Sequence, residues 1–280
     1  MIAALAAIFS PLGFLLSGII ALVYTKSIQT GSQVLVLSAL VAFVVSYLLT
    51  GNSLSGSLLL MEFILPVGLM AYVFEKTSQF NKAMESGIWL AVVLGVLAFA
   101  YEPNQTQWWT NQLQWMMQPV ISQSEPELAQ ELQSFITNFA PYMTSVMVFA
   151  LLSIWYAGFV WGTYWSSKIM APGQFRLAFV RFTLSKVLAA LTIIALIFTL
   201  ISEDAFTGLA GTLATIGIFA FMIQGMAVVH YQAGVRNWSK FWMVIFYVLL
   251  GFFPQVMLMV AFLGILDLFK PLRNAPATSL

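Results

Sequence analysis

The sequence predicts an all-α fold, a polytopic transmembrane helical bundle with about eight spans and with broken first and last segments. Three observations support this prediction. Apolar residues make up 61% of the 280 positions, well above the roughly 45–50% that is typical of soluble globular domains. Charged residues make up only 8%, and the mean hydropathy is +0.92. Several apolar stretches also reach the roughly 18–20 residues that a helix needs to cross a bilayer.

The apolar stretches divide the chain into candidate spans within a single integral membrane domain, 1–280. The candidate spans are residues 12–25, 33–50, 57–74, 86–101, 140–164, 179–201, 206–232 and 240–267. Pro11 removes a backbone donor and disfavours helix at Ser10, so the short apolar stretch before it is broken there. Pro254 interrupts the last segment, which is too long for one perpendicular span although each half is too short to cross alone. The last segment is therefore either one kinked, tilted helix or a re-entrant pair.

The charges alternate between successive breaks, and this alternation predicts an orientation. Basic residues follow every second span, at Lys26, Lys76, Lys82, Lys168, Arg176, Arg181, Lys186, Arg236 and Lys240. The intervening breaks are uncharged or acidic, so the positive-inside rule places the basic breaks in the cytoplasm and the 102–139 loop outside a bacterial inner (plasma) membrane. Lys270 and Arg273 depend on the last segment. A single span would put them outside, whereas a re-entrant pair, which we favour, would leave them in the cytoplasm.

The 102–139 loop is the only sizeable soluble portion of the predicted topology. Its first part is rich in tryptophan and amide side chains and contains Trp108 and Trp109. Its second part predicts an amphipathic helix near 125–139, with Ser124 as the N-cap. One face of that helix carries Leu128, Leu132, Phe135, Ile136 and Phe139. Such a helix either lies on the outer membrane–water interface or covers the bundle.

Several classes of chemistry are excluded by composition and motif. The chain has no cysteine, which excludes disulfides, thiolate metal sites and cysteine nucleophiles. His230 is the single histidine, so a metal site built from several histidines is impossible. No phosphate-binding glycine motif and no basic block occurs, so neither a nucleotide nor a nucleic acid is expected. We therefore predict a protein that is not an enzyme and that uses no cofactor and no metal.

Glu62 is the strongest candidate for a ligand-binding residue, because ionisable groups at membrane depth are rare and costly. Pro66, four residues further on, clashes with the carbonyl of Glu62 and frees it from the helix ladder. A carboxyl group and a freed carbonyl beside a kink could bind a cation or a polar ligand. The alternative is a protonated or water-exposed glutamate that faces the bundle and binds nothing.

The other candidate ligand-binding residues each have a simpler structural explanation. Gln224 lies in mid-helix, where an amide commonly forms a hydrogen bond between helices. His230 lies near the cytoplasmic end of the same helix, where a hydrogen bond at the membrane interface would account for it. Trp108 and Trp109 would lie near the mouth of a site that contains Glu62, or would simply anchor the outer loop in the interface.

Small residues at a spacing of four predict closely packed helices. Gly87, Ala91 and Gly95 form one such stripe, and Gly158 and Gly162 form another. This spacing lets two helix backbones approach closely, either inside the fold or between chains. Packing inside the fold is the default interpretation, because a compact bundle needs many such contacts.

Several strings together resemble the YybS-like family of bacterial multi-pass membrane proteins of unknown function. They are IQGMAVVH at 223–230, the basic linker before it, and FLGILDLFKPLR at 262–273. The opening SPLG at 10–13, followed by Lys26 and the Thr30-Gly31 turn, is also similar to that family.

The YybS-like family is grouped distantly with the substrate-binding S components of energy-coupling-factor transporters and with the cell-shape protein MreD. Similarity to S components implies a compact helical bundle with a ligand pocket near its outer side. It also implies that small residues on the first helix, at the spacing of Ala3 and Ala7, contact a transporter partner.

Taken with the motifs, this resemblance predicts a non-enzymatic solute-binding or transport-associated protein. The alternative is a scaffold or assembly component of an envelope membrane complex, which the absence of motifs and the small-residue stripes also favour. Besides the lipid bilayer, the predicted partners are a small-molecule ligand or a membrane protein.

Overall fold

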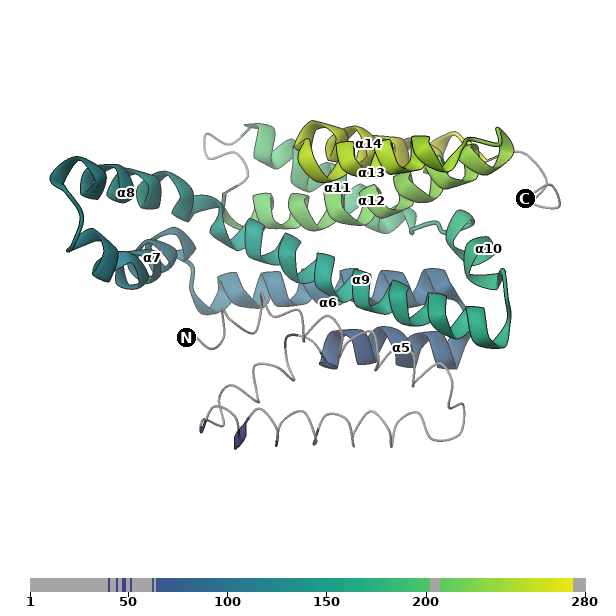
Figure 1. Cartoon of the computed structure of the whole chain (residues 1–280), viewed down its shortest axis with the longest axis horizontal. Helices are drawn as coiled ribbons and strands as arrows, with labels where there is room; N and C mark the ends of the chain where they lie inside the picture. Colours follow the sequence, from purple (N-terminus) through teal and green to yellow (C-terminus); the bar gives the residue numbers. More distant parts are fainter. Residues whose placement is uncertain are drawn as a thin grey trace. The chain divides into compact units, whose positions relative to one another are not determined.

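The computed structural model describes residues 64–201 and 207–273, together with a few isolated positions between 40 and 62. Every regular element within these residues is helical, which confirms the all-α prediction for them (Figure 1). In chain order the elements are α5 (Leu65–Thr77), α6 (Phe80–Tyr101), α7 (Gln105–Ile121), α8 (Pro126–Phe139), the short 3₁₀ turn η2 (Ala140–Tyr142), α9 (Met143–Met170), α10 (Gln174–Val180), α11 (Lys186–Ile201), α12 (Gly208–Val235), α13 (Lys240–Phe252) and α14 (Pro254–Phe269). The predicted spans at 12–25 and 33–50 and the break at Pro11 lie outside the described residues.

Within the described residues, three helical stretches are long and apolar enough to cross a membrane. They are α6, α12 and the continuous stretch Pro126–Ile169, which contains α8 and α9. The bent pair α13 and α14 would add a fourth if it counted as one span. α11 is apolar but has only 16 residues, which at about 1.5 Å per residue is shorter than the roughly 30 Å hydrocarbon core. These residues therefore carry three or four candidate spans, fewer than the sequence predicts for them.

The predicted span at 179–201 begins later than expected. α10 ends at Val180, and residues 182–185 have no helical assignment before α11 begins at Lys186. Backbone groups in this connection bond to side chains of other elements; the N–H of Leu184, for example, donates to the Gln224 carbonyl oxygen at 2.9 Å. The sequence alone could not reveal that residues 182–185 are non-helical, because their hydrophobic pattern matches that of the helix that follows them.

The described residues form two compact units. The first contains the described residues up to Leu90, Leu151–Lys186 and those from Ile218 on, and the second contains Ala91–Ala150 and Val187–Gly217. The core of the first unit contains a cluster of aromatic rings. Phe80 stacks on Phe159 at 6.0 Å between ring centroids and meets the rings of Phe74 and Phe182 edge-on.

In the second unit, the tryptophan-rich part of the 102–139 loop is a helix, α7, which forms a hairpin with α8. The Trp109 indole donates to the Thr144 hydroxyl at 2.9 Å, and this hydroxyl donates to Gln105 at 3.2 Å. The predicted N-cap at Ser124 is wrong. Its hydroxyl donates to the Val120 carbonyl of α7 at 2.7 Å, and Glu125 occupies the N-cap position without a side-chain hydrogen bond to the helix.

The apolar face predicted for 125–139 is present on α8, but most of it is not buried by the described residues. Ile136 is buried, whereas Leu128 and Phe135 are about half exposed. Exposed apolar and aromatic residues on one face of a helix fit contact with a membrane interface. The side of the membrane on which this hairpin lies remains a prediction.

α13 and α14 form a sharply bent pair in the first unit. The two helices bend by 111° at their junction and contact each other (Figure 1). α13 starts directly after the turn that ends α12, and the Leu272 carbonyl beyond α14 accepts a hydrogen bond from Gln232 of α12 at 2.7 Å. The pair therefore begins and ends beside the same end of α12. Arg273 donates to the carbonyls of Val180 and Phe182, so it lies at the same end as Arg181.

The packing of α14 on α12 depends on two glycines. A Cβ added at Gly225 would collide with the Val260 carbonyl oxygen, and one added at Gly264 would collide with the Phe221 carbonyl oxygen. The two backbones therefore approach closely without side chains between them, as small residues permit in membrane helices. Neither glycine belongs to the stripes predicted from the sequence.

The predicted small-residue stripes also face protein. A Cβ at Gly87 would lie 2.9 Å from the Met70 sulfur and 3.1 Å from the Tyr156 hydroxyl. In the second unit, Ala91 is buried and a Cβ at Gly95 would make ordinary 3.7 Å contacts with α12. The second stripe, Gly158 and Gly162, is buried on α9.

Candidate functional site

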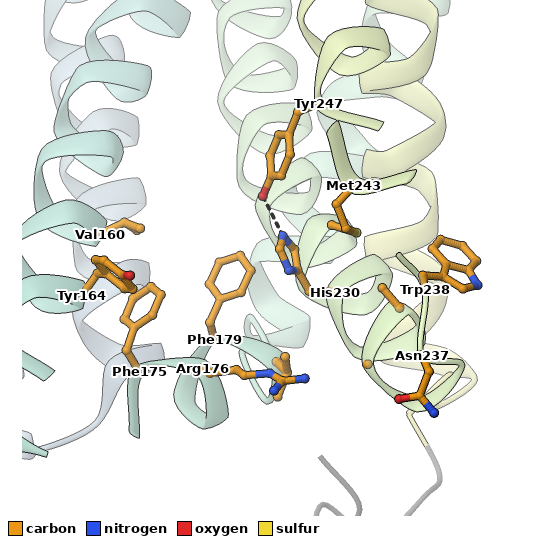
Figure 2. Close-up of a pocket in the computed structure, with 13 residues that line it drawn as sticks. Val160, Tyr164, Phe175, Arg176, Phe179, His230, Asn237, Trp238, Met243 and Tyr247 are labelled. Atoms are coloured by element: carbon orange, nitrogen blue, oxygen red, sulfur yellow. Dashed lines mark hydrogen bonds between the residues drawn. The ribbon is translucent and has the colours of Figure 1, made fainter. Parts of the chain in front are cut away.

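A cavity of about 520 Å³ lies within the first unit, where α9, α10, α12 and α13 come together (Figure 2). Most of its walls are aromatic or aliphatic, and a few polar groups reach into it. Its lining residues are Val160, Tyr164, Phe175, Arg176, Phe179, Val180, His230, Ala233, Gly234, Asn237, Trp238, Met243 and Tyr247. Small-molecule sites in proteins typically combine such apolar walls with a small number of polar groups.

His230 and Tyr247 form the central polar pair of this cavity. The Nε2 atom of His230 lies 2.6 Å from the Tyr247 hydroxyl, and Figure 2 shows the two side chains pointing toward each other. Phe179 of α10 meets the imidazole edge-on at 5.5 Å between ring centroids. The imidazole is thus held from two sides by side chains of two other helices.

The turn between α12 and α13 creates this pairing. α12 ends at Val235, and Asn237 adopts a left-handed conformation with φ of 52°. Asparagine tolerates that conformation better than most residues. The chain therefore reverses within a few residues, and α13 carries Tyr247 back alongside His230.

α10 supplies the aromatic wall of the cavity and its positively charged side chain. Gly173 precedes the helix with φ of 87°, a conformation that favours glycine, and so allows the sharp entry into α10. Phe175 and Phe179 are one helical turn apart and stack at 5.9 Å. Arg176, also of α10, lines the cavity. Among the described residues that line the cavity it alone carries a permanent charge and none is acidic, so the cavity favours an anionic group.

Of the predicted ligand-binding residues, only His230 lines this cavity. Glu62 lies elsewhere in the first unit, and the indole N–H of Trp155 donates to its backbone carbonyl. The carbonyl that Pro66 was predicted to free is thus bonded to a residue of α9. One carboxylate oxygen of Glu62 is buried without a hydrogen-bond partner among the described residues.

Replacing Trp155 with phenylalanine should destabilise the protein by about 1–3 kcal/mol, because the Glu62 carbonyl loses its donor inside the fold. Pro66→Ala restores the N–H that would bond to this carbonyl in a regular helix. The loss caused by Trp155→Phe should therefore be smaller in a Pro66→Ala background, as measured by unfolding of purified protein in detergent. Trp242→Phe, at an exposed tryptophan, is the control. Strictly additive effects of the first two changes would contradict this account.

Gln224 forms the hydrogen bond between helices that the sequence predicted. Its amide group is fully buried and donates to the Gly264 carbonyl at 3.0 Å and to Asp267 at 3.2 Å. Its carbonyl oxygen accepts from the N–H of Leu184. These contacts are structural, and Gln224 does not line the cavity.

Asp267, which the sequence suggests is simply the mark of a helix end, is buried and ion-paired. Its two oxygens accept a forked pair of hydrogen bonds from Arg273, and its side chain is only 3% exposed. The N–H of Leu272 also donates to it at 3.0 Å. The sequence does indicate that Asp267 needs a basic partner. Placing an aspartate within the apolar string FLGILDLF costs free energy unless its charge is paired.

Trp108 and Trp109 belong to the second unit. Trp109 is bonded to Thr144, and Trp108 packs edge-on against it at 4.7 Å. Within the first unit, neither Glu62 nor Gln224 lines the cavity that contains His230. The sequence missed Arg176 and Tyr247, because only the fold brings α10 and α13 to His230.

No curated protein and no solved structure matches the chain. A protein family does: its description is "Predicted membrane protein (DUF2232)", and it matches residues 1–268, nearly the whole chain. The apolar helices described above agree with that description. The chain therefore belongs to the DUF2232 family of predicted membrane proteins.

Proposed function

We propose that this protein is a non-enzymatic solute-binding or transport-associated membrane protein, and that its solute binds in the cavity beside His230 and Tyr247. The cavity itself carries this proposal. Its volume of about 520 Å³ falls in the range of roughly 300–1,000 Å³ that ligand pockets occupy. Its aromatic walls and few polar groups suit binding and orientation of a small molecule better than chemical conversion.

The lining residues indicate the chemical class of the solute. Arg176 provides a positive charge that no acidic lining residue offsets, and the His230–Tyr247 pair offers hydrogen bonds. The rings of Phe175 and Phe179 provide a flat apolar wall. A small amphipathic molecule with an anionic group would match all three features.

The positive-inside rule would place this cavity at the cytoplasmic side, because it adjoins the turn that carries Arg236. The sequence had suggested a mouth on the outer side, near Glu62. In the proposed arrangement the solute is bound or released on the cytoplasmic side instead. This placement is part of the proposal and rests on the charges of the chain.

Arg176→Gln should lower the amount of bound solute at least tenfold, because a hydrogen bond to a charged group contributes about 1.5–3 kcal/mol. The measurement is mass spectrometry of small molecules extracted from protein purified out of native membranes. His230→Phe, which removes the polar partner of Tyr247, should lower the bound amount as well.

The matched control is Arg236→Gln, which removes an exposed basic residue that does not line the cavity. It should leave the extracted molecules unchanged. An identical set and amount of molecules from wild type and Arg176→Gln would refute the solute site. If proteins instead of small molecules were enriched with the wild type, the scaffold alternative would take its place.

A further inference from the structure

The first unit contains a second cavity, of about 710 Å³, next to the connection between α10 and α11. It is lined by the residues of this connection, by Tyr231 of α12 and by the segment around Asp267 and Arg273. Neither His230 nor Tyr247 lines it, so it has its own set of polar groups.

The connection presents its polar side chains to one side. Along residues 180–184 buried and exposed positions alternate: Val180, Phe182 and Leu184 are buried, whereas Arg181 and Thr183 are exposed. The side chains of Arg181 and Thr183 are thus turned away from the buried side chains of Val180, Phe182 and Leu184.

Hydrogen bonds to distant residues hold the connection in place. Arg273 donates to the Val180 carbonyl at 2.7 Å and to the Phe182 carbonyl at 2.9 Å. Asn81 of α6 donates to the Thr183 hydroxyl at 3.2 Å. Arg181 is therefore presented from a backbone that is fixed on both sides of it.

The charges that line this cavity do not balance. Asp267 is the one acidic residue among the described residues that line it, and its two oxygens accept hydrogen bonds from Arg273, Gln224 and the Leu272 N–H. Arg181 and Lys186 also line the cavity, and neither forms an ion pair with another residue in the described part of the chain. Two positive charges are thus left for a ligand.

Glu85 contacts the connection but does not belong to the lining of the cavity. Glu85 accepts hydrogen bonds from the Ser185 hydroxyl and from the Trp89 indole, and it does not line the cavity. Its carboxylate is engaged with α6 and the Ser185 side chain. The unbalanced charges on the cavity wall remain those of Arg181 and Lys186.

We propose that this cavity binds the phosphate group of an anionic ligand, held by Arg181 and Lys186. A guanidinium matches two oxygens of a phosphate, and an ammonium adds a point charge. Basic pockets between membrane helices commonly take the headgroups of anionic lipids. A lipid headgroup and a soluble phosphate compound share this chemistry, and the experiment separates the two sources.

The test uses native mass spectrometry of the full-length protein in mild detergent. The probes are the anionic lipid phosphatidylglycerol, the zwitterionic lipid phosphatidylcholine, which has no net charge and serves as the comparison, and inorganic pyrophosphate. Wild type should bind phosphatidylglycerol at least fivefold more than phosphatidylcholine, and this excess should disappear in the double variant Arg181→Gln/Lys186→Gln. Arg181→Lys/Lys186→Arg, which keeps both charges, should retain at least half of the excess.

The matched control is Arg236→Gln/Lys240→Gln, which removes the same number of charges from exposed positions outside the cavity. It should bind as wild type does. Binding of pyrophosphate by wild type but not by Arg181→Gln/Lys186→Gln, without an excess of phosphatidylglycerol, would support the site and identify its source as a soluble phosphate. The proposal is overturned if the two double glutamine variants bind alike, or if wild type binds neither anion preferentially.

Discussion

Replacing Arg273 with methionine is expected to destabilise the protein by about 3–5 kcal/mol, a large loss for a single substitution. The reason is the position of its partner. The Asp267 side chain is 3% exposed, so it would remain buried after losing the forked hydrogen bonds from Arg273. The Val180 and Phe182 carbonyls would lose a donor in the same step.

Denaturant unfolding in detergent would measure this loss. Lys270→Met, at an exposed basic residue three positions away, should change the stability by no more than about 0.5 kcal/mol. Adding Asp267→Leu to Arg273→Met should recover part of the stability, because the unpaired buried charge is then gone. If Arg273→Met were as mild as Lys270→Met, the buried ion pair would not stabilise α14 in this way.

Gly264→Val is expected to have an effect of similar size by a different cause. A Cβ at this position would collide with the backbone oxygen of Phe221. A backbone atom cannot avoid this collision by a change of rotamer, as a side chain could. α14 would have to move away from α12, and the Gln224 hydrogen bond to the Gly264 carbonyl would be lost with it. We expect a loss of about 3 kcal/mol or more, since overpacking costs about 1–3 kcal/mol and the buried amide adds to that.

Gly251→Ala is the matched control for this change. Gly251 lies in α13, and a Cβ there would meet nothing within 4 Å. The control should therefore be neutral or stabilise the protein by up to about 1 kcal/mol, because alanine favours helix. Unfolding curves of the two variants, recorded side by side, check the prediction. Equal stability of Gly264→Val and Gly251→Ala would show that the close contact of α12 and α14 is not required.

The sequence predicted those features that depend on neighbouring residues. Helical class follows from composition, and the freed carbonyl at Glu62 follows from Pro66 four residues away. The donor that satisfies this carbonyl, Trp155, is 93 residues away and had no local signal. The same limit explains the cavity, because His230 was recognised as a candidate whereas its partners on α10 and α13 were not.

Some predictions were wrong because a helix and a non-helical segment can have the same pattern of apolar residues. The alternating residues 180–184 resembled the start of a helix because their buried members are apolar, as those of a helix would be. Hydrogen bonds to Gln224 and Arg273, far away in the chain, hold this segment in a non-helical connection. The segment 105–121 was assigned to a loop because of its amides and tryptophans, yet its backbone is helical.

The hydrogen bonds of Arg273 also bear on the order in which the protein is made. Arg273 leaves the ribosome 91 residues after Phe182, whose carbonyl it binds. Until α14 and Arg273 follow, the backbone groups of the α10–α11 connection lack these protein partners and need water, since a bare polar group in hydrocarbon is costly. The α10–α11 connection is therefore expected to stay in contact with water at the membrane surface during synthesis. The first unit is expected to complete its packing only after α14 and Arg273 have been made.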